Sequence, residues 1–283
     1  MVNTLQEALA WAEEKQVAIG HFNVSDSVQF EAVVEAAREL GVPVMIGVSE
    51  GERKWIGVSE VVALVRAERE KGLPIFLNAD HTRSIDGIKE ALAAGFDEVL
   101  FDGSSLSLQE NITATKEVVA LAQAENRGVL VEGELGYIGT ASEVRLDVPK
   151  DLKMTDPEEA RQFVKATGID LLAPAVGNIH GMLRDGTDPA LDIERIAAIA
   201  EAVSRPLVLH GASGNSEEDV RKAIADGVRI VHINTEIRAA YREGMEEGLA
   251  GHPDEVAPYK YMAEAKEAVK TVVLAKLRLF NHL

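Results

Sequence analysis

Short apolar segments alternate with longer amphipathic segments from one end of the chain to the other. Each apolar segment is rich in valine, isoleucine or leucine and is short enough to form a buried parallel strand. The expected strands are Val17–Val24, Val44–Val48, Pro74–Ala79, Glu98–Phe101, Val129–Val131, Ile169–Ala175, Pro206–Leu209 and Arg229–Ile233. Between and after them, helical patterns cover about residues 26–40, 58–71, 84–94, 107–125, 157–166, 192–202, 216–226 and 235–248.

This order of elements predicts an α/β fold with a parallel sheet and right-handed crossovers, and eight strand–helix units can close into a (β/α)8 TIM barrel. The alternative is an open, doubly wound sheet, which usually carries a glycine-rich phosphate turn after its first strand. The first strand here ends in Asn23-Val24-Ser25-Asp26, without such a turn. We therefore expect a single barrel domain over residues 1–283, with a C-terminal helical extension over about 255–283. Its helix, about 257–280, would pack on the barrel or on a neighbouring subunit.

The charge of the chain limits the classes of partner that it can bind. Its 29 basic and 47 acidic side chains give a formal net charge of −18, which disfavours binding to nucleic acid or to an anionic membrane. No apolar run approaches the ~18–20 residues that span a bilayer, and the first residues lack the pattern of a signal peptide. Cysteine is absent, so any metal site must use histidine or carboxylate ligands. We expect a soluble cytoplasmic protein.

Histidines gather at the expected strands. Five of the seven fall within or just after a strand: His21, His81, His180, His210 and His232. In a barrel, the side chains that carry chemistry lie at the carboxyl ends of the strands. Three of these histidines, His81, His180 and His210, follow the third, sixth and seventh strands and predict a Zn²⁺ site with one position open for water or substrate. The alternative is that they pack in the core or orient other ligands.

A phosphate site is expected beside these histidines. Gly211-Ala212-Ser213-Gly214 follows the seventh strand, and Asn234-Thr235 opens the helix after the eighth. Barrels commonly bind phosphate in these two loops, through backbone N–H groups at a helix N-terminus. Gly181 and Gly211, each directly after a histidine, allow a ligand to approach the backbone closely, and Arg184 could add a charged donor. Ordinary turn glycines are the alternative interpretation.

Carboxylates near the strand ends predict proton transfer and cation binding. Asp80, directly before His81, is a candidate general acid–base, or alternatively a carboxylate that orients a histidine. Asp102, Glu132 and Glu134 could bind a second cation or hold the metal in another position, unless they only close the barrel. No lysine lies within an expected strand or at its immediate end, which disfavours Schiff-base chemistry and favours metal-dependent carbonyl activation.

Short polar motifs occur at most of the expected strand ends. They are His21-Phe22-Asn23-Val24, Asn78-Ala79-Asp80-His81, Phe101-Asp102-Gly103-Ser104, Val131-Glu132-Gly133-Glu134-Leu135-Gly136, Ala175-Val176-Gly177-Asn178-Ile179-His180-Gly181, Leu209-His210-Gly211-Ala212-Ser213-Gly214 and Asn234-Thr235-Glu236. In this set and order the chain resembles the class II, metal-dependent fructose-bisphosphate aldolases, including their tagatose-bisphosphate branch. The motifs run from the first strand to the last.

The resemblance implies an enzyme that reversibly cleaves a ketose 1,6-bisphosphate into dihydroxyacetone phosphate and glyceraldehyde 3-phosphate through a zinc-stabilised enediolate. Among the ketose bisphosphates, fructose 1,6-bisphosphate is the expected substrate. The resemblance further implies that His81, His180 and His210 hold the catalytic zinc and that Asp80 moves the proton at the carbon–carbon bond. A buried, second or monovalent cation would lie at Asp102 and Glu134, with Glu132 close by. We also expect a homodimer or homotetramer.

The resemblance also implies that Gly181, Gly211, Ser213 and Thr235 bind the phosphate of dihydroxyacetone phosphate. With the other polar residues near the strand ends, the expected substrate contacts are Asn23, Ser49, Gly181, Arg184, Gly211, Ser213, His232, Asn234 and Thr235.

The chain departs from the family's usual pattern at several positions. His232 stands where the family typically has asparagine, Asn234 where it often has aspartate, and Arg184 where it has a lysine. In the loop after the fifth strand, Gly139-Thr140-Ala141-Ser142-Glu143 makes Glu143 the candidate loop acid. These departures leave fructose and tagatose bisphosphate as alternative substrates. They also leave a second class of function open, a metal-binding barrel that acts as a sugar-phosphate sensor or scaffold without turnover.

Overall fold

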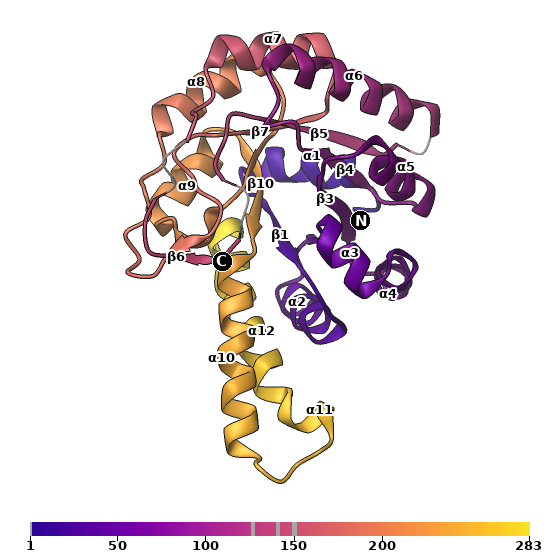
Figure 1. Cartoon of the computed structure of the whole chain (residues 1–283), viewed down its shortest axis with the longest axis vertical. Coiled ribbons are helices and arrows are strands. Elements are labelled where there is room, and N and C mark those ends of the chain that lie inside the picture. Colours follow the sequence, from indigo (N-terminus) through magenta and orange to yellow (C-terminus); the bar gives the residue numbers. More distant parts are fainter. Residues whose placement is uncertain (1, 126–127, 140–141, 149–151) are drawn as a thin grey trace.

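Parallel strands close into a barrel in the computed structural model, which describes residues 2–125, 128–139, 142–148 and 152–283 (Figure 1). In order around the barrel they are β1 (Ile19–Asn23), β2 (Val44–Gly47), β3 (Ile75–Thr82), β4 (Glu98–Phe101), β5 (Leu130–Leu135), β7 (Leu171–Pro174), β9 (Leu207–Leu209) and β10 (Val228–Ile233). The barrel closes where β10 pairs with β1, which places Ile19 opposite Ile230 and His21 opposite His232. The predicted (β/α)8 barrel is confirmed, and the open sheet is wrong for this chain.

Helices surround the barrel and bury the outer faces of its strands. They are α2 (Ser27–Leu40), α3 (Glu50–Ile56), α4 (Val58–Glu70), α5 (Ile85–Ala94), α6 (Leu108–Glu125), α7 (Pro157–Thr167), α8 (Ile193–Val203), α9 (Glu217–Ala225) and α10 (Thr235–Gly251). Two helices, α3 and α4, stand between β2 and β3 where the sequence predicted one, because Gly57 at φ 91° ends the first of them. Within the described residues, no helix has the length and apolar character needed to cross a membrane.

An N-terminal helix that the sequence analysis did not predict, α1 (Leu5–Lys15), covers the amino end of the barrel. Thr4 begins it with a capping box in which Glu7 is the partner. The buried face of α1 packs in one apolar cluster with residues from the first half of the strands, among them Met45, Phe76 and Ile230. The amino end is therefore filled with hydrocarbon, and the opposite end is left for polar side chains.

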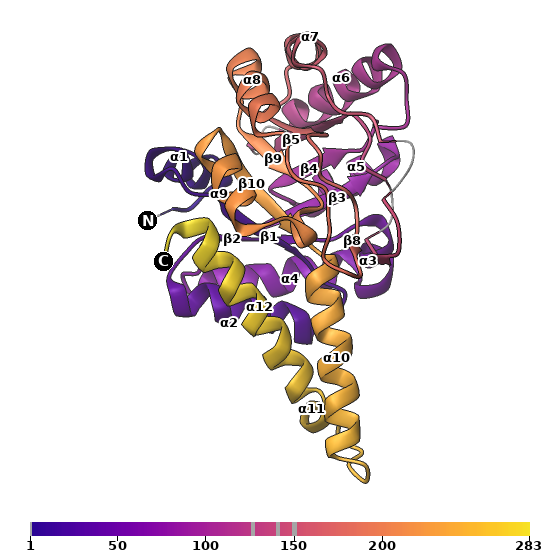
Figure 2. The ribbon, with the colours of Figure 1, turned by 90° about the vertical axis from the view of Figure 1, so that its left-hand side faces the viewer.

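The C-terminal segment forms a helical hairpin whose tip projects from the barrel (Figures 1 and 2). α10 runs outward, α11 (Pro258–Tyr261) lies at the tip, and α12 (Ala263–Asn281) returns to the barrel, so the single helix expected over 257–280 is divided. One face of α12 is buried at four-residue intervals, at Ala265, Val269, Val273 and Leu277. This face explains why α12 packs along α10 and α2 and reaches β1.

Two short strands join the loops above the carboxyl end of the barrel. β6 (Val144–Arg145) follows β5, and β8 (Met182–Leu183) follows β7, and the two pair in parallel. The Arg145 side chain also donates a hydrogen bond of 2.9 Å from Nε to the carbonyl oxygen of His180. These contacts tie the loop after β5 to the segment that carries His180. After β9, Ala212–Gly214 forms one turn of 3₁₀ helix, η1.

Candidate active site

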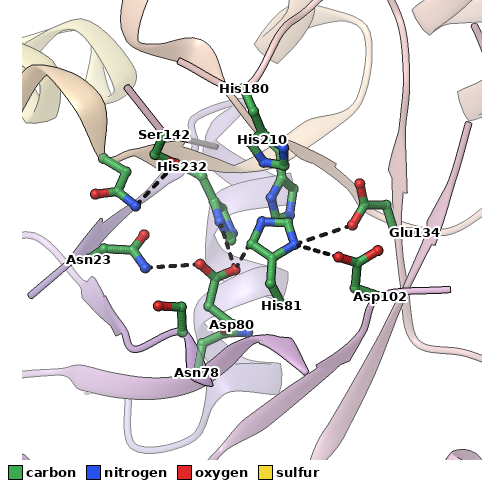
Figure 3. Close-up of polar contacts among 12 residues, drawn as sticks. Asn23, Asn78, Asp80, His81, Asp102, Glu134, Ser142, His180, His210 and His232 are labelled. Atoms are coloured by element: carbon green, nitrogen blue, oxygen red, sulfur yellow. Dashed lines mark hydrogen bonds and ion pairs between the residues drawn. The ribbon is translucent and has the colours of Figure 1, made fainter. Parts of the chain in front are cut away.

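The end of β3 brings two adjacent side chains to the same side of the backbone. His81 has a φ of 42°, in the left-handed region that residues other than glycine rarely occupy. The pairing of β3 with β4 is irregular between Ala79 and Thr82. In a regular strand Asp80 and His81 would point to opposite faces, whereas here both line one cleft (Figure 3). The backbone therefore departs from regular strand geometry at the candidate catalytic residues Asp80 and His81.

The three predicted zinc ligands meet at this end of the barrel. One ring nitrogen from each of His81, His180 and His210 lies within 4.8 Å of the others. The ring centroid of His81 lies 4.7 Å from that of His180 and 4.9 Å from that of His210. Figure 3 shows the rings converging above Asp80. The sequence prediction that these histidines come together is confirmed by this geometry.

Hydrogen bonds on the outer sides of two rings orient them. His180 donates from Nδ1 to the carbonyl oxygen of Gly139 at 2.6 Å, and His210 Nε2 lies 2.8 Å from Oε1 of Glu132. Such bonds fix the tautomer of a metal-binding histidine and leave the other nitrogen as the ligand. Burial lowers the pKa of His180 to about 3 and that of His210 to about 4, so both imidazoles are neutral, as metal binding requires.

His81 lies among three carboxylates. Its Nδ1 is 3.4 Å from Asp102 and 3.4 Å from Glu134, and its Nε2 is 3.7 Å from Asp80. Burial alone would lower the pKa of His81, but the neighbouring carboxylates, Asp80 first and then Asp102 and Glu134, raise it well above its ordinary value. The surroundings of this ring therefore favour positive charge.

These observations test whether the residues fit a metal ion. Buried oxygen atoms of Asp80 and Glu134 lack a hydrogen-bond partner among the described residues, and buried polar atoms are seldom left without one. Three imidazoles with carboxylates nearby are a donor set typical of a catalytic divalent metal, and His81 would lose its extra proton when the metal binds. A second group of possible ligands, His81, Asp102 and Glu134, lies directly beside it. The donor set fits a divalent cation.

Asp80 is held by a neighbouring amide. Asn23 donates from Nδ2 to Oδ2 of Asp80 at 2.9 Å and to Oε2 of Glu52 at 2.9 Å. Burial would raise the pKa of Asp80, but the nearby imidazoles, His81 first, and the Asn23 amide hold it well below its ordinary value. Asp80 is therefore an ionised carboxylate with one oxygen left open toward the histidines. Glu52, which the sequence analysis did not identify, supports this arrangement.

The remaining acidic groups differ in their surroundings. Asp102 accepts hydrogen bonds from Ser104 Oγ at 2.6 Å and from Arg83 Nε at 3.0 Å, which places it in a polar setting. Burial raises the pKa of Glu132 to about 7, and it also raises that of Glu98, with Glu132 adding to the effect. The sequence analysis predicts Glu98 only as the start of a strand, although an acid inside an apolar segment is the signal that could have identified it.

The expected phosphate groups line the same cleft. Gly181 and Gly211 both adopt positive φ, and a Cβ on Gly211 would lie 2.1 Å from the carbonyl oxygen of Ile179. Ser213 Oγ accepts from the backbone N–H of Glu236 at 3.3 Å, near the start of α10. Around the cleft are Asn23, Asp80, His81, Ser142, His180, Gly181, His210, Gly211, Ser213, His232, Asn234 and Thr235.

Six expected site residues lie outside this cleft lining: the acids Asp102, Glu132 and Glu134, and Ser49, Arg184 and Glu143. The Ser49 hydroxyl caps α3 and donates to Glu52 at 2.8 Å. Arg184 is exposed, with its backbone N–H bonded to Arg145. Glu143 is also exposed, 3.6 Å from Arg145. In the same loop Thr140 and Ala141 lie outside the described residues, whereas Ser142 reaches the cleft.

A (β/α)8 barrel with a candidate metal centre at the carboxyl ends of its strands is the class that this fold and site define. The chain belongs to the class II fructose-bisphosphate aldolase family, whose model matches residues 3–283. This family consists of metal-dependent lyases. The recognised resemblance is thereby confirmed.

Individual relatives agree with this assignment over nearly the whole chain. A fructose-bisphosphate aldolase of Thermus caldophilus is 36% identical, covering 99% of this chain and 98% of its own length. One of Staphylococcus epidermidis is also 36% identical, covering 98% and 96%. Among solved structures, the YdjI aldolase of Escherichia coli K12 superimposes with a TM-score of 0.84 at 32% identity, covering 99% of this chain and 97% of its own.

Proposed function

We propose that this chain reversibly cleaves fructose 1,6-bisphosphate into dihydroxyacetone phosphate and glyceraldehyde 3-phosphate in a Zn²⁺-dependent reaction. The observation that carries the proposal is the meeting of His81, His180 and His210 beside the ionised Asp80. Membership of the aldolase family supports the reaction type. The names of the relatives support the choice of fructose bisphosphate.

His81, His180 and His210 would hold the ion. When bound, Zn²⁺ would supply a Lewis acid that polarises the ketone of the substrate. Around it, Glu132 and the Gly139 carbonyl keep the His210 and His180 rings in position. Asp102, Glu134 and the nearby Glu132 would offer oxygen ligands to a second or monovalent cation.

Asp80 is the group that moves the proton. Cleavage requires a base that removes the hydroxyl proton beside the bond that breaks, while the electron pair of that bond stays with the dihydroxyacetone half. Asp80 is ionised and can accept this proton, and it returns the proton to the same oxygen in the direction of condensation. The carbon that keeps the electron pair takes up a proton, delivered by a second acid or by water, to complete dihydroxyacetone phosphate. Asn23 holds the carboxylate through one oxygen, so the other remains available.

The phosphate of the dihydroxyacetone half would bind at Gly181, Gly211, Ser213 and Thr235. Positive φ at both glycines turns the chain where a side chain would meet neighbouring backbone. The start of α10 adds backbone N–H groups, because Asn234 provides no side-chain cap there. These features favour a phosphate dianion at this end of the cleft.

The projecting hairpin supports the expectation of a homo-oligomer. Its tip exposes apolar side chains, among them Leu249, Val256 and Tyr259. Large apolar groups on a protruding element commonly mark a protein contact. Light scattering coupled to size-exclusion chromatography should give a dimer or tetramer mass, and a monomer mass at assay concentration would contradict this part of the proposal.

The decisive experiment is a cleavage assay on fructose 1,6-bisphosphate and tagatose 1,6-bisphosphate, with and without a chelator. We expect cleavage of the fructose compound that is lost with chelator and restored by Zn²⁺. Faster cleavage of tagatose bisphosphate would reassign the substrate and leave the reaction type intact. Tight binding of both compounds without cleavage would contradict the aldolase activity and favour the alternative function of a sugar-phosphate sensor.

A further inference from the structure

Two buried histidines form a stack inside the barrel. The register between β1 and β10 places His21 directly opposite His232. Their ring centroids are 3.4 Å apart and the planes differ by only 5°. On its other side, the His232 ring lies 3.8 Å from the ring of His210, tilted by 35°. The imidazole of His232 is therefore held between two other rings.

The two nitrogens of His232 have different surroundings. Nδ1 lies 3.7 Å from Oδ1 of Asp80, and an ionised carboxylate there favours the tautomer with the proton on Nδ1. Nε2 is buried and has no hydrogen-bond partner among the described residues. In this tautomer Nε2 is an acceptor. His232 lines the cleft, so a substrate hydroxyl is the group that could satisfy it.

His21 occupies a space that the surrounding residues leave for an aromatic ring. Its Nε2 lies 3.4 Å from Oδ1 of Asn78 on β3. On β2, a Cβ at Gly47 would lie 2.0 Å from Cε1 of His21 and 2.3 Å from Nε2. The ring therefore fits only because residue 47 has no side chain. His21 does not line the cleft itself.

We propose that Nε2 of His232 accepts a hydrogen bond from a hydroxyl group of the ketose phosphate, and that His21 is a positioning residue that keeps the His232 ring in the required orientation. The proposal rests on the proposed function. A ring held between the stacked His21 ring and the tilted His210 ring cannot turn about χ2 to follow a displaced hydroxyl. The pair would thus favour one configuration at the carbon that carries this hydroxyl, because a buried acceptor left unpaired lowers transition-state binding.

A double-mutant cycle tests whether His21 acts through His232. We expect His232→Ala to lower kcat/KM for the preferred ketose bisphosphate about 100-fold and His21→Ala roughly tenfold. The double variant should match His232→Ala, because nothing remains for His21 to orient. The proposal would be overturned if the loss of kcat/KM in the double variant equalled the product of the two single losses. Unchanged kinetics in His21→Ala would also overturn it.

Two more variants separate orientation from loss of structure. His21→Phe keeps a flat ring without its nitrogens and should retain most of the activity, whereas Gly47→Ala should displace the ring and resemble His21→Ala. Metal content and Tm are measured for each. If His21→Ala does not fold, the comparison of His21→Phe with Gly47→Ala decides. Equal losses in these two would contradict a role for stacking.

An imidazole nitrogen NMR measurement keeps the inference independent of turnover. We expect one His232 tautomer, protonated on Nδ1, in the wild-type protein and a mixture of tautomers in Gly47→Ala. Absence of cleavage by the wild-type protein would refute the proposed function, while an unchanged His232 spectrum in Gly47→Ala would refute the positioning role.

Discussion

The two ends of the barrel use the same strands for opposite purposes. β3 begins with Ile75 and Phe76 among apolar side chains, and near its end Asp80 and His81 line the cleft. β10 changes in the same way, from Ile230 to His232. At the amino end the residues bury apolar surface against α1. At the carboxyl end polar groups are held close together, and some have no hydrogen-bond partner in the part of the chain that the structure describes. Inside the barrel, the amino end therefore contributes apolar packing, and the carboxyl end contributes the polar groups of the candidate site.

Removing a metal ligand should have the largest effect on the carboxyl end. We expect His180→Ala to abolish measurable cleavage and to lose the bound zinc, because two imidazoles do not complete the site. Zinc content by plasma mass spectrometry and the rate of cleavage are the measurements. His252→Ala, which removes a partly exposed histidine on the hairpin, is the matched control and should leave both unchanged. Full activity without zinc would contradict the assignment of His180 as a metal ligand.

Removing the base should separate chemistry from metal binding. Asp80→Ala is expected to lower kcat by ~10²–10⁴-fold, the usual contribution of a general acid–base, while zinc content stays near one per chain. Asp86→Ala removes an exposed acid on α5 and serves as the control. If Asp80→Ala keeps near wild-type turnover, the carboxylate only orients a neighbour.

A substitution at the amino end of the barrel should change the stability of the protein and leave its kinetics unchanged. Phe76→Ala removes a buried ring beneath α1 and should lower the free energy of unfolding by about 3–5 kcal/mol. Below its Tm, the folded variant should retain wild-type kcat/KM. Denaturant unfolding and steady-state kinetics give the two values, and Trp55→Ala, an exposed aromatic, is the control. A large loss of kcat/KM at full folding would show that the two ends are coupled.

The smallest expected effect comes from the cap of α1. Thr4→Ala removes the hydroxyl that accepts from the Glu7 backbone and should cost about 1 kcal/mol of stability, with unchanged kinetics. Thermal unfolding followed by circular dichroism would detect it. No change in Tm would mean that the start of α1 frays without affecting the cover of the barrel.

The sequence identified most of the fold because buried parallel strands are nearly continuous apolar segments. It underestimated β5, which continues through Glu132 and Glu134, because these acids interrupt the apolar pattern. Strands of two residues, such as β6, carry no periodic signal. α1 has the helical spacing of buried residues at Leu5, Ala8, Leu9 and Ala12, so its pattern is visible in the sequence although no helix was predicted there.

The candidate site was predicted where residue type and strand position were sufficient. Three histidines at strand ends met as expected, whereas the shared orientation of Asp80 and His81 depends on a backbone angle that no pattern displays. Ser49 was expected at the substrate because it follows a strand, yet its hydroxyl caps α3. The stacking of His21 on His232 depends on register, which the sequence alone does not specify.

X-ray absorption spectroscopy at the zinc edge of the purified protein tests the central claim most directly. If His81, His180 and His210 hold the ion, the spectrum should show three imidazole nitrogens at ~2.0–2.1 Å and one or two further oxygen atoms. His180→Ala should reduce the imidazole count or leave the protein without zinc. A spectrum dominated by carboxylate oxygens, or unchanged by His180→Ala, would contradict the account.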